Sequence, residues 1–223
     1  MQERIVERVD SSYPIDKLMP FCEAAINDDR PAAVNMRPED WQNRPNTFLY
    51  CLYIEKRYDG ARACYYIYRE NGKIVAGHGY YPFEADSNMY VQSRVYSIPS
   101  HIKPLGKSKL TTSNMLGSLL ADKALTQNYI GSIISLEHYN EQLADKIVRI
   151  TQPHRYPNYY YDTQIVNGKV IKPRHYKDYG LRTQPMKKYG TCMIKGVPQI
   201  VIYHLFDEDY RDELFKNLDK VKV

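Results

Sequence analysis

The sequence predicts an α/β (α+β) fold: a mixed, mostly antiparallel sheet with a central parallel strand pair and flanking helices. Short β-rich runs separated by turn signals occupy much of the first half and return near the end. Between them, a strand, a helix and a second strand follow within about 45 residues, which favours parallel pairing through a right-handed crossover. We expect a single domain over 1–223, because 223 residues are too few for two domains of ordinary size.

The first half is expected to hold a helix followed by antiparallel strands. Apolar residues at helical spacing predict a helix over 15–27, interrupted by Pro20. Three β-rich runs then follow, at 48–54, 61–68 and 73–81. Asn71-Gly72, between the last two runs, is a strong hairpin signal.

The central stretch, 91–150, is expected to form a strand, a basic loop, a helix, a second strand and a second helix. The first strand covers 90–98, and apolar residues over 115–124 then share one helical face. The almost uncharged run 129–136 suits a strand covered on both faces. Asn140 is expected to cap the second helix. The apolar side of that helix consists of Leu143, Ala144, Ile147 and Val148.

The last part of the chain combines an expected insertion with a closing hairpin. The insertion, 152–188, is basic and rich in Tyr and Pro, and Asn-Gly within 165–171 predicts a small hairpin there. The strands of the closing hairpin are expected at 189–195 and 199–206. Asp207 is expected to cap a C-terminal helix over about 207–220.

Composition and charge limit the classes of function. The net charge of +5 favours anionic ligands, but the chain lacks the dense Lys/Arg stripes of dedicated nucleic-acid binders. Four widely spaced cysteines predict buried thiols in a reducing compartment and no metal site. The chain has no long apolar run and no signal-peptide start, so we expect no membrane contact. The expected location is a cytoplasm, or a host cytoplasm or virion if the source is viral.

A basic loop, 99–109, leads from the first central strand into the helix and contains three lysines and Gly106. Backbone N–H groups at a helix N-terminus attract anions, glycine permits close approach, and lysines add charge, so such a loop can hold phosphates. The alternative is a solvated basic loop. An ATPase or GTPase P-loop is excluded, because its pattern requires glycine where His101 stands.

The order of these elements resembles that of the GCN5-related N-acetyltransferase (GNAT) family over roughly 15–206. The family's signature loop, [RQ]-x-x-G-x-[GA], is similar to Lys-Pro-Leu-Gly-Lys-Ser at 103–108. The first glycine is kept, whereas Lys replaces Arg or Gln, Ser replaces the last small residue, and Pro104 removes one N–H. The stretch 136–143 resembles the end of strand five and the start of helix four, where the family often has an asparagine facing the cofactor; here it is Asn140.

This resemblance implies a site for acetyl-CoA as a co-substrate. The pantetheine arm would pair with the backbone of the strand before the basic loop, and the pyrophosphate would lie on the loop itself. The residues implied in cofactor binding are Val95, Ser97, Lys103, Gly106, Lys107, Ser108 and Asn140.

The resemblance also implies direct attack of an amine on the thioester, which needs a base for the ammonium proton and an acid for the departing thiolate. Glu137 is the candidate base and Tyr139 the candidate acid; alternatively, Glu137 opens the helix and interacts with its dipole. His78 is a candidate for the acceptor site, because Gly77 and Gly79 on either side leave backbone room for a ligand. The alternative is a core histidine or a bulge.

The sequence therefore predicts an acyl-CoA-dependent N-acyltransferase that acetylates an unidentified amine of a small molecule or a protein. One alternative is a GNAT-like scaffold without catalysis, which assembles with a protein partner through 152–188, for instance in a phage particle. It is suggested by Pro104 and by Ile147, which stands where the family usually has tyrosine. In a second alternative, tyrosines 156 and 159–161 stack on nucleic acid, although we do not expect nucleic acid as a partner.

Overall fold

The computed structural model describes residues 4–28, 49, 52–53, 58, 62–98, 112–137, 140–150, 164–166, 169–171 and 185–223. The chain forms two units, described separately below: 1–81, 93–123 and 159–174 in the first, and 82–92, 124–158 and 175–223 in the second. Within the described ranges, no helix is long and apolar enough to cross a membrane.

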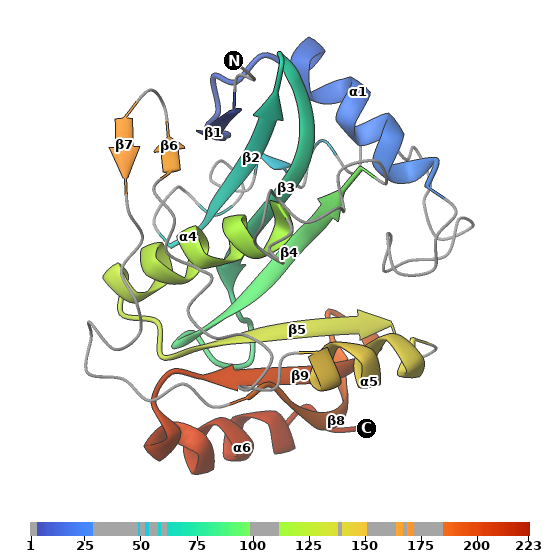
Figure 1. Cartoon of the computed structure of the whole chain (residues 1–223). Coiled ribbons are helices and arrows are strands. Elements are labelled where there is room, and N and C mark those ends of the chain that lie inside the picture. The colour runs from blue at the N-terminus through green and yellow to red at the C-terminus, as the bar shows by residue number, and fades with distance from the viewer. Residues whose placement is uncertain are drawn as a thin grey trace. The chain divides into compact units, whose positions relative to one another are not determined.

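The helices and strands follow the predicted alternation. In chain order they are β1 (Arg4–Arg8), α1 (Ile15–Ile26), β2 (Cys64–Glu70), β3 (Lys73–Pro82), β4 (Met89–Ser97), α4 (Thr112–Thr126), β5 (Gly131–Glu137), α5 (Glu141–Ile150), β6 (Gln164–Val166), β7 (Lys169–Ile171), β8 (Lys187–Ile194), β9 (Val197–Leu205) and α6 (Arg211–Asp219), the last preceded by a short 3-10 turn, Glu208–Tyr210 (Figure 1). The order confirms the predicted strand–helix–strand–helix unit after Val91, both late hairpins and the C-terminal helix.

The sheet is mixed and mostly antiparallel, as predicted. Its strand order is β7-β6-β1-β2-β3-β4-β5-β9-β8. β4 runs parallel to β5, with Met89–Val91 opposite Gly131–Ile133, which confirms the predicted central parallel pair. β1 and β6 form a further parallel contact, between Val6 and Val166. The described registers of β1 with β2, β2 with β3, β5 with β9, β6 with β7, and β8 with β9 are antiparallel.

In the first unit, α1 and α4 cover opposite faces of the β2–β3 hairpin. Tyr65 and Ile67 of β2 point into an apolar core that includes Phe21 of α1. Because side chains alternate along a strand, His78 of β3 points to the opposite face. There its imidazole lies beside Gly117 of α4, 3.5 Å from the position that a Cβ on that glycine would occupy.

The hairpin turn matches the sequence expectation, and the first helix differs from it at Pro20. Asn71 and Gly72 have φ angles of 47° and 79°, the left-handed pair that a two-residue turn between right-twisted strands requires. The helix α1 lies in the predicted range, but the interruption expected at Pro20 is absent: the helix is continuous through this residue, which is exposed. Cys22, Cys64 and Cys192 are buried thiols, as predicted, and Cys51 lies outside the described residues.

In the N-terminal part, one expectation was wrong and one strand was missed. The run 48–54 was expected to be a strand, but Leu49 and Leu52 are helical and buried. A spacing of three places both leucines on one side of a helix, where they join the core with α1, whereas a strand would point them to opposite faces. Strand β1 was not predicted, because only Ile5 and Val6 of its five residues are apolar.

In the second unit, α5 and α6 pack on opposite faces of β9. Ile200 and Ile202 point to one face and form an apolar cluster with Ala144 of α5. Tyr203 points to the other face, where its ring centroid lies 5.4 Å from that of Phe215 in α6. This packing confirms the apolar side predicted for α5.

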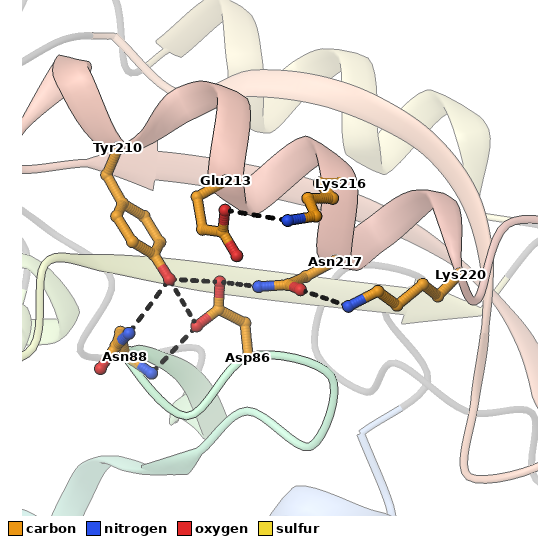
Figure 2. A network of polar contacts seen from close by, with 7 residues as sticks. All are labelled: Asp86, Asn88, Tyr210, Glu213, Lys216, Asn217 and Lys220. Carbon is orange, nitrogen blue, oxygen red and sulfur yellow. Dashed lines mark hydrogen bonds and ion pairs between the residues drawn. The ribbon is translucent and has the colours of Figure 1, made fainter.

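A buried carboxylate network holds the start of β4 in the second unit (Figure 2). The Asp86 side chain, 5% exposed, accepts hydrogen bonds from the Tyr210 hydroxyl at 3.1 Å to each oxygen, and from the Asn217 amide at 3.1 Å. It also accepts the backbone N–H of Asn88 at 3.0 Å. The Asn88 carbonyl accepts the N–H of Ile130 at 3.0 Å, so this loop is tied both to α6 and to the chain that enters β5.

Candidate functional site

The C-terminal half of β4 carries two of the predicted cofactor residues, Val95 and Ser97. The Val95 side chain is 41% exposed, whereas Ser97 is 8% exposed. Tyr96, between them, points into the core, and its ring packs on Phe21 of α1 with centroids 5.4 Å apart. In this half of the strand, Val95 is therefore exposed and the next residue, Tyr96, is buried.

Arg94, directly before Val95, has an unusual backbone conformation. Its φ angle is +47°, in the left-handed region that side chains with a Cβ rarely adopt. Of the non-glycine residues with positive φ in the described ranges, Asn71, Asn128 and Lys195 lie in turns, and Arg94 is the one inside a strand. A left-handed residue within a strand is typical of a β-bulge, which bends the strand and redirects the residues that follow.

Tyr65 reaches the Arg94 backbone from β2, across the intervening strand β3. Its ring lies over Gly77 and Gly79, where a Cβ would come within 3.0 Å of Tyr65 atoms. Its hydroxyl donates a 2.8 Å hydrogen bond to the Arg94 carbonyl. The two glycines thus provide the space through which a buried tyrosine contacts β4.

His78 lies between those glycines but on the other face of the sheet. It is 5% exposed, and its ring lies beside Gly117 of α4. The space beside Gly77 and Gly79, expected to admit a ligand, is filled by the ring of Tyr65. The role of His78 toward an acceptor stays a prediction.

Glu137 and Asn140 lie in the second unit, where β5 ends and α5 begins. The Asn140 N–H donates to the Glu137 carbonyl at 2.8 Å, and the Asn140 carbonyl accepts the N–H of Ala144 at 3.0 Å. Asn140 is therefore the residue that opens the helix, as predicted. Glu137 is opposite Gln199 of β9 in the register, so the end of β5 is fixed on that side.

An ion-pair cluster holds α5 against β8. The Lys188 ammonium group contacts the Glu141 carboxylate and lies 2.9 Å from the Asp145 carboxylate. These two hydrogen-bonded carboxylates raise the pKa of Lys188, because they favour its charged form. The first two turns of α5, directly after Asn140, are thereby anchored to the hairpin.

Several predicted site residues lie outside the described part of the chain: Tyr139, Lys103, Gly106, Lys107 and Ser108. The tyrosine-rich part of the insertion, 154–161, does so as well. Among the residues that the structure describes, no group of three or more His, Cys, Asp or Glu side chains is arranged to hold a metal ion.

The structure adds two residues to this region that the sequence argument missed, Tyr65 and Arg94. The conformation of Arg94 could not be predicted from the sequence, because arginine has no preference for the left-handed region. Tyr65 was one of 22 tyrosines. The pattern Gly77-His78-Gly79 was the available signal, since two glycines on one face of a strand indicate that something bulky crosses it.

The fold resembles those of solved acetyltransferases. An acetyltransferase from Streptococcus agalactiae matches with a TM-score of 0.50 and 10% identity, covering 91% of this chain and 98% of that one. An acetyltransferase of the GNAT family from Staphylococcus aureus matches with a TM-score of 0.50 and 11% identity, covering 92% and 100%. No family model and no curated protein matches the sequence. At these identities the likeness shows a shared fold and nothing beyond it.

Proposed function

We propose that this chain is an acyl-CoA-dependent N-acyltransferase that transfers an acetyl group to an amine. The observation that carries the proposal is the C-terminal half of β4, where the left-handed Arg94 precedes the exposed Val95. In this proposal, backbone N–H and C=O groups of Val95–Ser97 pair with the amides of a pantetheine arm, as an added strand pairs with a sheet. The fold shared with two solved acetyltransferases supports the same function.

The basic loop after β4 supplies the charge that the anionic end of acetyl-CoA requires. Lys103 and Lys107 flank Gly106, and α4 begins at Thr112 soon after. In this proposal the pyrophosphate binds to that loop, where lysine side chains and backbone N–H groups favour anions. Ser108 and Asn140 are the remaining proposed contacts of the cofactor.

The proposed reaction joins an amine nitrogen to the acetyl carbon of the thioester. The C–S bond breaks, the thiolate leaves, and the ammonium proton must be removed before or during the attack. Glu137 is the proposed base and Tyr139 the proposed acid that protonates the thiolate. His78 is the proposed contact for the acceptor, whose amine belongs to a small molecule or a protein.

Calorimetric titration of the whole chain with acetyl-CoA tests the proposal. We expect wild-type binding that weakens with added salt, and a dissociation constant about tenfold or more higher for Lys107→Glu, since a cation–phosphate contact becomes a repulsion. Lys17→Glu is the matched control, because it makes the same change in net charge at an exposed position of α1. We expect its affinity to equal that of the wild type.

The outcomes separate the alternatives. Absence of binding at millimolar acetyl-CoA contradicts the proposed function. Binding without thiol release in the presence of primary amines favours the scaffold without catalysis, with 152–188 as its assembly surface. Salt-dependent binding of single-stranded DNA would support the alternative in which the tyrosines of the insertion stack on nucleic acid. A cytoplasmic location stays a prediction.

A further inference from the structure

We infer that Tyr65 is a positioning residue for acyl-CoA binding: it fixes Arg94 in its left-handed conformation and thereby sets the direction of Val95–Ser97. The inference rests on the proposed function, because it assigns Tyr65 to the strand segment that would pair with the pantetheine arm. It adds to that function a residue two strands away from β4, with a role that its position in the sequence does not suggest.

Arg94 adopts a backbone conformation that its residue type disfavours. A residue with a Cβ disfavours the left-handed region, so a strand interior does not adopt φ = +47° without an outside contact that fixes it. The Arg94 carbonyl accepts the hydroxyl of Tyr65 at 2.8 Å, which is a direct contact with the backbone of the strained residue. This bond favours the bent form of the strand over an extended one.

The side chain of Tyr65 is itself held rigidly. Its side chain is fully buried, in the core that α1 closes with Leu18 and Phe21. Its ring has no room to move toward β3, because Gly77 and Gly79 contact it closely. The hydroxyl of a ring held in this way has a fixed position, so its hydrogen bond restrains the Arg94 carbonyl in β4.

The conformation of Arg94 also sets the direction of the residues that follow it in β4. Val95 follows Arg94 and is 41% exposed, while Tyr96 is 3% exposed. Relaxation of Arg94 to an extended conformation would reorient the peptide group between Arg94 and Val95. The backbone groups offered to a ligand along Val95–Ser97 would then lose their present alignment.

Tyr65→Phe tests the inference, because it removes the hydroxyl and keeps the ring. We expect the dissociation constant for acetyl-CoA to rise about tenfold, as the loss of one buried hydrogen bond would give. In the free protein, amide hydrogen exchange in 93–98 should become faster, while exchange in 64–70 stays unchanged. Tyr68→Phe is the matched control: it lies on the same strand, is buried, and loses a 3.0 Å bond to Glu70 instead.

A second change distinguishes positioning from general stability. Arg94→Gly allows the left-handed conformation without strain, so Tyr65→Phe should affect acetyl-CoA affinity less in that background than in the wild type. If Tyr65→Phe does not fold, Arg94→Val replaces it. A β-branched residue strongly disfavours the left-handed region, and the same loss of affinity and faster exchange over 93–98 are expected.

The results separate this inference from the function on which it rests. Wild-type binding with unchanged affinity and exchange in Tyr65→Phe overturns the role of Tyr65 and leaves the proposed function standing. Equal losses of affinity in Tyr65→Phe and Tyr68→Phe also overturn it, because the effect would then be general destabilisation. Absence of acetyl-CoA binding by the wild type overturns the proposed function and, with it, the role of Tyr65 in ligand binding.

Discussion

The two halves of β4 are fixed by different kinds of contact. The N-terminal half pairs with β5 over Met89–Val91. The loop before it is held by the buried carboxylate of Asp86, which accepts hydrogen bonds from Tyr210 in the 3-10 turn and from Asn217 in α6. The C-terminal half contains the left-handed residue Arg94, whose carbonyl accepts a hydrogen bond from the hydroxyl of Tyr65. The segment Met89–Val91 is thus fixed by strand pairing and by the hydrogen bonds of Asp86. The segment Val95–Ser97, proposed to bind a ligand, depends on the contact between Tyr65 and Arg94.

This difference has a physical consequence for mutations. Contacts around a buried charge contribute mainly to stability, because their loss leaves several buried donors without an acceptor. A contact that favours one conformation of a ligand-binding segment contributes mainly to ligand affinity, because the ligand binds to that conformation. Changes at Asp86 should therefore lower the free energy of unfolding, and changes at Tyr65 should lower affinity more than stability.

The largest effect is expected for Asp86→Ala. The Tyr210 hydroxyl, the Asn217 amide and the Asn88 N–H would lose a charged acceptor, so we expect the free energy of unfolding to fall by about 2–4 kcal/mol in urea titrations. Asp212→Ala is the control, because that side chain is 92% exposed on α6, and a change below about 0.5 kcal/mol is expected. Equal changes in the two variants would contradict the anchoring role of Asp86.

Tyr210→Phe should give a smaller effect, about 1 kcal/mol at neutral pH, since one donor is lost and the ring stays. Burial, together with the nearby Asp86 carboxylate, raises the pKa of the Tyr210 hydroxyl. The unfolded chain therefore releases this proton first, near a pH of about 10, and the stabilisation is present below that pH and lost as pH rises above it. Wild-type stability should fall more steeply there than that of Tyr210→Phe, and parallel curves would contradict the assignment.

The smallest effect is expected for Lys188→Met. Its carboxylate partners Glu141 and Asp145 are 58% and 64% exposed, so solvent screens the cluster despite its short contacts. We expect a loss of about 0.5 kcal/mol or less at low salt and none in about 1 M salt. A salt-independent loss as large as that of Asp86→Ala would show that burial does not separate these two networks.

The tyrosine content shows where composition was informative. Twenty-two tyrosines against five phenylalanines indicated that many aromatic residues needed hydroxyl partners. The structure provides such partners through contacts distant in sequence: Tyr65 with Arg94, Tyr96 with the Ala24 carbonyl, and Tyr210 with Asp86. The need for partners was predictable from the sequence, whereas the identity of each partner was not.

The candidate site divides in the same way. Asn140 as the start of α5 follows from local chemistry, because the preference for a helix-opening residue acts within a few positions. The contact between Tyr65 and Arg94 joins residues 29 positions apart and crosses a third strand. Lys103, Gly106, Lys107, Ser108 and Tyr139 lie outside the described residues, so their roles stay predictions.

The sequence by itself determined the strand–helix–strand–helix order of β4, α4, β5 and α5, the Asn71-Gly72 turn and the apolar side of α5. Each depends on short-range periodicity or on backbone preferences of single residues. Only the tertiary structure decided that Leu49 and Leu52 are helical, that β1 joins the sheet, and that Tyr65 crosses β3 to reach β4. These features depend on contacts between distant segments, where the space available and the pairing of buried polar groups outweigh local preference.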